Sequence, residues 1–220
     1  MSSPRHVIAW DIETVPLRPA SYSERQQRRA KLLLDEEIRR KPDADIDELS
    51  RLVRSLHPML GRICCISLVR MDAAGTVGRP KSYTAAVPGD EIMMLRQFWA
   101  DVARLPSSGI RWVTFGGKRF DVDWLKVRSA ALGLVPSRRD ILDTYPYKQD
   151  PHCDLARVFD CRSGLDDLCD LVGVASPKGE LDGSGVAAAV DAGLIESVAE
   201  YCERDVVATL GVYSKLEPQI

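Results

Sequence analysis

The sequence predicts one α/β domain built around a mixed β-sheet. Its 220 residues are 45% hydrophobic, which is enough apolar material for a single compact core. Apolar runs of strand length alternate with runs in which apolar residues recur every three or four positions. Their order is three strands, a helix, a strand, a helix and further helices. This order is typical of an α/β fold with a mixed sheet.

Four strands are predicted from the apolar runs, at residues 6–13, 63–69, 82–87 and 111–115. In the first strand, alternate residues point to opposite faces, and both faces are apolar until Asp11 and Glu13. This pattern indicates a central strand whose C-terminal end emerges at a site.

Four helices are predicted from the three- and four-residue spacing, at residues 92–105, 120–134, 165–172 and 194–216. Between the first two strands lies a polar insertion, roughly residues 18–56, which we expect to form two helices within the single domain 1–220. Its helix starts are predicted as capping boxes, at Ser21 with Glu24 and at Asp45 with Glu48. The basic run 25–31 can contact a phosphate backbone or form a solvated helix face.

Composition indicates the surface charge of the protein and the cellular compartment in which we expect it. The 30 Lys and Arg residues against 32 Asp and Glu residues give a formal charge of −2, so no broad basic surface is predicted. No apolar window is long enough for a membrane helix, and the N-terminal residues lack the apolar core of a signal peptide. We therefore expect a soluble, cytoplasmic protein without a membrane partner. Its six cysteines lack framework spacing, and we expect reduced, mostly buried thiols.

Asp11 and Glu13 are the first candidate site residues. They lie two positions apart on a predicted strand, so their side chains project to one face about 7 Å apart, close enough to share metal ions. A solvated strand terminus has the same pattern.

Tyr201 and Asp205 form a second candidate pair near the end of the chain. They are four residues apart on a predicted helix and therefore share a face. They lie at the margin of a stripe that we expect to be buried, formed by Val198, Cys202, Val206, Leu210 and Tyr213. Packing of that stripe on the sheet would bring the phenol and the carboxylate toward the strand end. An interfacial Tyr and a surface Asp would also fit the pattern.

Asp121 follows the segment 116–120 at a strand-to-helix junction. It can be a metal-binding carboxylate beside Phe120, an aromatic that stacks on a base or sugar. It can also be an Asp favoured by the helix dipole, with Phe120 in the core. If these carboxylates converge with the other candidates, cations must offset their repulsion. Two Mg²⁺ or Mn²⁺ ions, roughly 3.5 to 4 Å apart, are the expected solution.

Three segments resemble the exonuclease motifs of the DEDD superfamily. They are Trp10-Asp11-Ile12-Glu13-Thr14, Phe115-Gly116-Gly117-Lys118-Arg119-Phe120-Asp121 and Tyr201-Cys202-Glu203-Arg204-Asp205. Tyr201 indicates the tyrosine-bearing, or DEDDy, branch, because the histidine branch has a His where Glu200 stands. More narrowly, the chain is similar to the predicted 3′-to-5′ exonucleases related to the proofreading domain of family B DNA polymerases.

This resemblance implies a ribonuclease H-like fold, with a mixed five-stranded sheet flanked by helices, and hydrolysis from a 3′ end. It also implies roles for the motif residues. Asp11 would bridge two divalent metal ions, Glu13 and Asp205 would complete the first metal site, and Asp121 would support the second. Tyr201 would orient the attacking water.

The expected substrate is a single-stranded or frayed 3′ end of DNA or RNA. The candidate substrate contacts are Thr14, Lys118, Arg119 and Phe120, whereas Trp124 is expected in the core. This chain departs from the family pattern at two positions. It has Gly116 where the family usually has Asn, and Asp123 where the family often has Pro. Two alternatives remain. The chain can be a catalytically weak nucleic-acid-binding module with the same fold, or a small-molecule phosphoesterase.

Three further residues fall in family-like segments and are left outside the catalytic set: Asp154, Lys178 and Asp182. The two aspartates can cap helices or turns, and the lysine can be a solvated loop charge.

Overall fold

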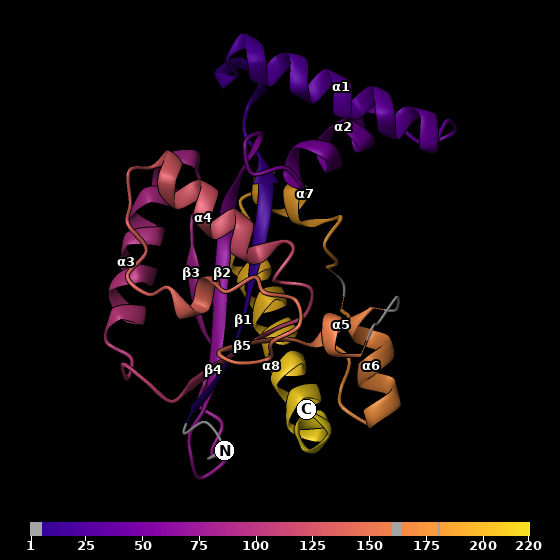
Figure 1. Cartoon of the computed structure of the whole chain (residues 1–220). Helices are drawn as coiled ribbons and strands as arrows, with labels where there is room; N and C mark the ends of the chain where they lie inside the picture. Colours follow the sequence, from indigo (N-terminus) through magenta and orange to yellow (C-terminus); the bar gives the residue numbers. More distant parts are fainter. Residues whose placement is uncertain (1–5, 160–163, 180) are drawn as a thin grey trace.

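A five-stranded mixed sheet forms the centre of the molecule (Figure 1). The computed structural model describes residues 6–159, 164–179 and 181–220. The strand order is β3-β2-β1-β4-β5. The strands are β1 (His6–Pro16), β2 (Gly61–Met71), β3 (Lys81–Thr84), β4 (Ile110–Thr114) and β5 (His152–Asp154). The mixed five-stranded sheet expected from the resemblance is thus confirmed.

The central strand β1 has different partners along its two edges. It pairs antiparallel with β2 from Val7 to Pro16, but it pairs parallel with β4 only from His6 to Ala9. Beyond Ala9, β1 therefore continues past the end of β4. This overrun leaves one edge of β1 without a paired strand at the position of Asp11.

Helices cover both faces of the sheet. The helices are α1 (Glu24–Arg40), α2 (Ile46–Ser55), α3 (Glu91–Ala103), α4 (Asp121–Ala131), α5 (Leu155–Val158), α6 (Leu165–Val172), α7 (Val186–Asp191) and α8 (Ile195–Leu216). Four short 3-10 turns complete the elements, at Pro19–Ser21, Pro88–Asp90, Asp140–Leu142 and Glu217–Gln219.

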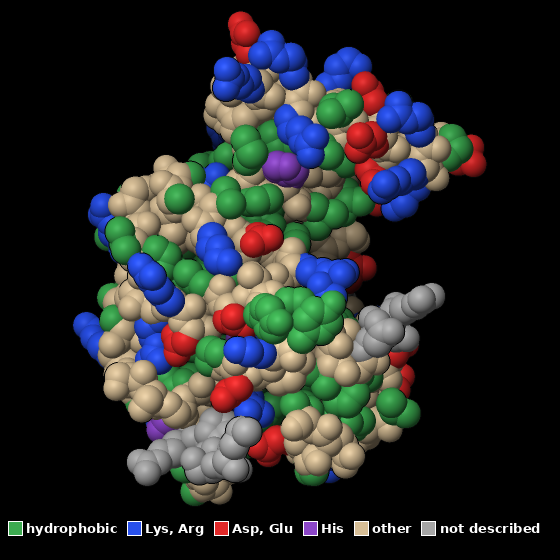
Figure 2. Space-filling model, in the orientation of Figure 1, with side chains coloured by type: hydrophobic (Ala, Val, Ile, Leu, Met, Phe, Trp, Pro, Cys, Tyr) green, Lys and Arg blue, Asp and Glu red, His purple; other side chains and the backbone are tan. Residues whose placement is uncertain are grey.

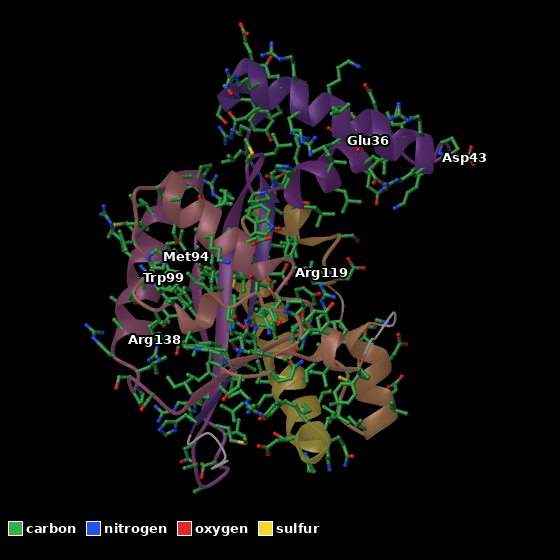
Figure 3. The ribbon with its side chains drawn as sticks, viewed as in Figure 1. Glu36, Asp43, Met94, Trp99, Arg119 and Arg138 are labelled. Atoms are coloured by element: carbon green, nitrogen blue, oxygen red, sulfur yellow. The ribbon has the colours of Figure 1, made fainter. Side chains whose placement is uncertain are left out.

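The alternation of β1 divides its side chains between two cores. Ile8 and Trp10 pack in one cluster with α3 and α4, and Figure 3 shows Met94 and Trp99 of α3 on this side of the sheet. Val7 and Ala9 pack on the opposite face, in a cluster with buried residues of α8. Both faces of β1 are buried before the carboxylates begin, as the sequence predicts.

The insertion between β1 and β2 projects from the body of the domain as two helices, and Lys and Arg side chains gather over it (Figures 1 and 2). Helix α1 buries none of its residues. The predicted cap at Ser21 is wrong, because Ser21 belongs to a 3-10 turn and Ser23 forms the capping box with Gln26. The prediction at Asp45 is confirmed in part, because its carboxylate accepts the N–H of Glu48.

The insertion is fastened at its base to the end of β1. The Thr14 hydroxyl donates to the Ser55 carbonyl at 2.6 Å, and the Gln26 amide donates to the Met59 carbonyl at 2.6 Å. Leu49 and Val53 of α2 are buried. These contacts tie α2 to the strand that carries Asp11 and Glu13, and α1 to the segment just before β2.

Two expectations about the chain's setting can be compared with the described residues. Five of the six cysteines are buried, free thiols, in agreement with the prediction, and Cys161 lies outside the described residues. Among the helices described here, none is long and apolar enough to cross a bilayer.

A buried ion pair joins α3 to α4. Glu91 is 1% exposed, accepts two hydrogen bonds from Arg128 at 2.9 and 2.6 Å, and also accepts the Ile63 N–H. We predict that Glu91→Gln lowers the free energy of unfolding by about 3 kcal/mol, because it leaves the Arg128 charge buried without its partner.

Urea unfolding of purified protein checks this prediction. The matched control is Glu24→Gln, which removes only the exposed pair with Arg28 and should leave the unfolding free energy nearly unchanged. Equal effects of the two substitutions would contradict the assignment.

Candidate active site

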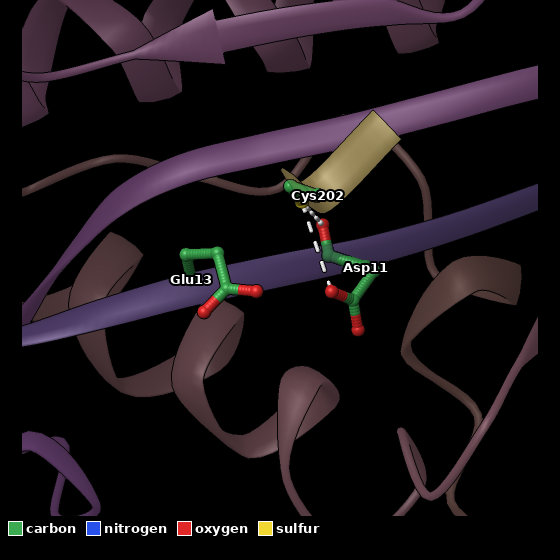
Figure 4. A group of neighbouring side chains, drawn as sticks. All are labelled: Asp11, Glu13 and Cys202. Carbon is green, nitrogen blue, oxygen red and sulfur yellow. Dashed lines mark hydrogen bonds between the residues drawn. The ribbon is translucent and has the colours of Figure 1, made fainter. Parts of the chain in front are cut away.

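The overrun of β1 past β4 forms the floor of the candidate site. In open α/β sheets, ligands bind beyond the carboxyl ends of the strands, at the point where the strand order reverses. In this sheet that point is the end of β1, because β2 lies on one side of β1 and β4 on the other. Asp11 and Glu13 stand in this region, side by side with Cys202 of α8 (Figure 4).

Helix α8 brings the second pair of candidates to the same place. All five residues of its predicted apolar stripe are buried, whereas Tyr201 and Asp205 are half-buried at the margin. The Cys202 thiol lies 3.7 Å from the Asp11 carboxylate and 3.7 Å from the Asp11 carbonyl oxygen. Packing of the stripe therefore fixes α8 against β1 over a separation of 191 residues.

Asp121 reaches the site from the first turn of α4 and is only 3% exposed. The turn before it packs tightly on its carboxylate. A Cβ atom on Gly117 would lie 2.5 Å from Asp121 Oδ2, so no larger residue fits there. Gly116 has a φ of 80°, a left-handed conformation that favours glycine. The two glycines thus allow the close turn that delivers Asp121.

Burial raises the pKa of all four carboxyl groups in the metal-free protein, and repulsion within the cluster adds to the shift for three of them. Burial, followed by the charge of Asp205, raises the pKa of Asp11 to about 8. Burial, followed by the charge of Asp11, raises the pKa values of Glu13 and Asp121 well above their usual range. Burial raises the pKa of Asp205 to about 6. At neutral pH Asp11 is therefore mostly protonated unless positive charge is supplied, whereas Asp205 stays mostly ionised, and the charged forms of Glu13 and Asp121 are disfavoured.

The donor set fits hard divalent cations. Carboxylate oxygens are the ligands that Mg²⁺ and Mn²⁺ prefer. Within the part of the chain that the structure describes, none of the ion pairs includes Asp11, Glu13, Asp121 or Asp205. The cluster therefore lacks a salt-bridged side-chain cation among the described residues, and bound metal ions would offset its repulsion.

A pocket of about 250 Å³ opens beside the carboxylates. Its lining includes Asp11, Tyr201 and Asp205 together with Leu181 and Asp182. Burial, followed by the charge of Asp205, raises the pKa of the Tyr201 phenol above its usual range. Tyr201 therefore keeps its proton at neutral pH and can donate a hydrogen bond into the pocket.

Lys118 is a correction to the predicted substrate contacts. Its side chain is 2% exposed, and its ammonium donates to the carbonyls of Tyr145 at 2.7 Å and Lys148 at 2.6 Å. The same ammonium lies 3.4 Å from Asp143. Its charge is used inside the protein and is not available to a phosphate in this conformation.

The other predicted contacts differ in how far they remain accessible. Thr14 is buried, and its hydroxyl already donates to Ser55. Phe120 is half-buried and packs at a ring distance of 5.8 Å on Trp124, which is in the core as expected. Arg119 is exposed, and Figure 3 shows it on the side of the molecule near α5 and α6.

Three residues that line the pocket have no role assigned from the sequence. Asp182 accepts the backbone N–H groups of Ser184 and Gly185, so it stabilises its own turn, as the pattern allowed. The exposed Lys178 side chain pairs with Asp166 at 3.0 Å. Asp166 was missed as a pocket residue, because its place in the first turn of α6 has the pattern of any helix start.

Comparison with solved structures shows the class of fold. The family B DNA polymerase from the hyperthermophilic archaeon Pyrobaculum calidifontis matches 98% of this chain at a TM-score of 0.65 and 20% identity. Escherichia coli exonuclease I, in a zinc-bound complex with single-stranded DNA, matches 100% of it at 0.50 and 13% identity. The chain spans only 25% of the polymerase and 41% of exonuclease I. The fold is the ribonuclease H-like fold of exonuclease domains.

The sequence comparison then gives the family. Residues 55–219 match the profile of a family described as predicted 3′-5′ exonucleases related to the exonuclease domain of PolB. The chain belongs to this family. Curated protein sequences yield no significant match.

The raised pKa of Asp11 predicts how the stability of the metal-free protein depends on pH. The unfolded chain releases this proton near pH 3.8, whereas the folded protein keeps it to about pH 8. The folded state binds more protons between these values, so its stability falls as the pH rises through this window. We predict that Asp11→Asn stabilises the protein, and that the gain is larger at pH 8 than at pH 5.

Urea unfolding in EDTA at both pH values measures this gain. A substitution of the exposed Asp123 by Asn should give no gain that grows with pH. A gain for Asp11→Asn that is constant or smaller at pH 8 would show that the carboxylate is not held in its neutral form.

Proposed function

We propose that this chain is a single-domain, metal-dependent 3′-to-5′ exonuclease that acts on single-stranded or frayed nucleic acid. One observation carries the proposal. Carboxylates from β1, α4 and α8 lie together at the end of β1, where burial raises the pKa of each and neighbouring carboxylates of the cluster raise it further for Asp11, Glu13 and Asp121. Such a cluster is costly to the fold and is explained by a demand for divalent cations.

The four carboxylates would divide between two metal positions. We assign Asp11, Glu13 and Asp205 to the first position, and Asp11 with Asp121 to the second. Two Mg²⁺ or Mn²⁺ ions, when bound, would activate the attacking water and stabilise the charge that develops on the leaving oxygen. The protein's part is to hold the ligands in place beside the pocket that Asp11 and Asp205 line.

Tyr201 would orient the nucleophile. Its phenol is protonated at neutral pH and faces the same pocket as Asp11 and Asp205. A hydrogen bond from this hydroxyl would hold a water in line with the scissile phosphate. Attack of the water on phosphorus breaks the bond to the 3′ oxygen of the preceding nucleotide. The products are a nucleoside 5′-monophosphate and a strand that ends in a new 3′ hydroxyl.

The substrate is proposed to be a DNA or RNA strand with a free 3′ end. The solved exonuclease I complex contains single-stranded DNA, which supports a single strand as the first substrate to test. The exposed Arg119, one residue before the Phe120 that packs on Trp124, is the remaining basic candidate of the second motif for a phosphate contact.

We predict that a 5′-labelled single-stranded oligonucleotide is shortened stepwise from its 3′ end with Mn²⁺ and is left intact with EDTA. Asp121→Asn should reduce the rate at least about 100-fold, because it removes a proposed metal ligand. The matched control is Asp123→Asn, an exposed carboxylate two residues along the same helix, which should keep full activity.

The same assay separates the alternatives. Binding of the oligonucleotide without metal-dependent shortening would favour a nucleic-acid-binding module. Release of phosphate from mononucleotides, with oligonucleotides untouched, would favour a small-molecule phosphoesterase. Equal activity of Asp121→Asn and Asp123→Asn would remove Asp121 from the metal site.

A second prediction concerns Tyr201. Tyr201→Phe should lower kcat about 10- to 100-fold, because it deletes the hydroxyl that aligns the water but keeps the ring in its packing. Its Mn²⁺ affinity should stay at the wild-type value, since no ligand is lost. Calorimetric titration with Mn²⁺ and single-turnover digestion measure the two effects, and strongly weakened Mn²⁺ binding would contradict the role.

A further inference from the structure

Asp154 is a fully buried carboxylate that the proposed reaction does not use. It is the last residue of β5 and has 0% exposure. Its two oxygens accept the backbone N–H groups of Gly116 at 2.7 Å and Lys118 at 3.0 Å. It makes no capping hydrogen bond to α5, the helix that it precedes, so of the two predicted roles, capping a helix or a turn, it has the second. The carboxylate therefore serves the neighbouring turn.

That turn is the support on which Asp121 rests. The carbonyl of Gly117 accepts the N–H groups of Phe120 at 3.3 Å and Val122 at 3.0 Å, so the turn and the start of α4 form one hydrogen-bonded unit. Gly117 also lies directly against the Asp121 carboxylate. A shift of the turn must then move Asp121 relative to β1.

Asp154 is itself held firmly in the sheet. It pairs with Thr114 in the parallel ladder of β4 and β5. The Thr114 hydroxyl and His152 Nε2 are 2.9 Å apart, and His152 Nδ1 is 3.0 Å from the Asp143 carbonyl. The sheet and these side-chain contacts therefore fix the position of Asp154, which in turn binds the 116–118 turn.

An ionised carboxylate is the side chain that suits this place. It offers acceptor oxygens to both N–H groups, whereas the amide of Asn offers one acceptor and turns a donor toward the other N–H. Charge-assisted hydrogen bonds to backbone N–H groups are also stronger than neutral ones. Two of the three residues of this turn are glycines without side-chain contacts, so its side-chain anchors are the buried Lys118 ammonium and the Asp154 carboxylate.

We propose that Asp154 is a positioning residue that holds the 116–118 turn and thereby sets Asp121 at the metal-binding crevice. The proposal rests on the proposed function for its catalytic consequence. Its physical content, the control of the turn and of metal affinity, can be measured without any turnover.

The test compares wild-type protein with Asp154→Asn. We expect hydrogen exchange at the Gly116 and Lys118 amides to become faster, and Mn²⁺ binding, followed by calorimetry without nucleic acid, to weaken about 10- to 100-fold. On an oligonucleotide substrate at saturating Mn²⁺, kcat should fall while KM stays near the wild-type value.

Glu91→Gln is the matched control, because it breaks a buried carboxylate contact to Arg128, about two helical turns along α4 from Asp121, and leaves the 116–118 turn untouched. It should lower stability without changing Mn²⁺ affinity, whereas a general loss of stability as the cause would weaken Mn²⁺ binding in both variants alike and overturn the proposal. Wild-type Mn²⁺ affinity in Asp154→Asn would overturn it too.

The result also separates this proposal from the proposed function. If the wild-type protein binds Mn²⁺ but digests no oligonucleotide, the exonuclease activity fails, and weakened Mn²⁺ binding in Asp154→Asn still supports the positioning role. If the wild-type protein digests oligonucleotides and Asp154→Asn equals it in rate and Mn²⁺ affinity, only the positioning role fails. Absence of Mn²⁺ binding by the wild-type protein overturns both.

Discussion

Mutual repulsion among four carboxylates, two buried and two half-buried, is the constraint on which the candidate site depends. Burying one ionised carboxyl group is unfavourable, and bringing three more beside it raises the cost further. The elevated pKa values of Asp11, Glu13 and Asp121 record that cost. The surrounding structure must therefore hold these groups together against their own tendency to separate or to take up protons.

The apolar clusters that pack on the two faces of the sheet supply that restraint. One apolar cluster fixes α4, which carries Asp121, and the other two fix α8, which carries Tyr201 and Asp205. Residues such as Trp10 on one face of β1 and Ala9 on the other bury the strand completely just before the carboxylates begin. Stability gained in the cores thus offsets instability concentrated at the strand end, a distribution that is common at functional sites.

Sequence patterns were sufficient where one physical cause dominates. The two-residue period of β1 predicts that Asp11 and Glu13 share a face, and the helical period of α8 predicts which residues are buried and that Asp205 lies at the margin. Strand β5 was not found from periodicity, because three residues are too few to show a period. A fifth strand was predicted only because the resemblance to the family implies a five-stranded sheet.

Other features depend on contacts that no local pattern contains. Lys118 looks like a phosphate contact beside the second motif, but carbonyls from residues 145 and 148 approach its ammonium only in the folded chain. Asp154 looks like a helix cap, yet it bonds a turn 36 to 38 residues earlier. The start of α1 is displaced from Ser21 to Ser23: both serines have the capping-box spacing, to Glu24 and to Gln26, but Ser21 belongs to the 3-10 turn that precedes the helix.

The insertion acquires a structural role from the same overrun that forms the crevice. Once β4 has turned away, the end of β1 keeps β2 as its single paired strand, and a register shift falls between Glu13 and Thr14. At this point the base of the insertion closes on the strand through the Thr14 hydroxyl and the buried residues of α2. The strand end that bears the two carboxylates is therefore held from outside the sheet, where it lacks a paired strand on its β4 side.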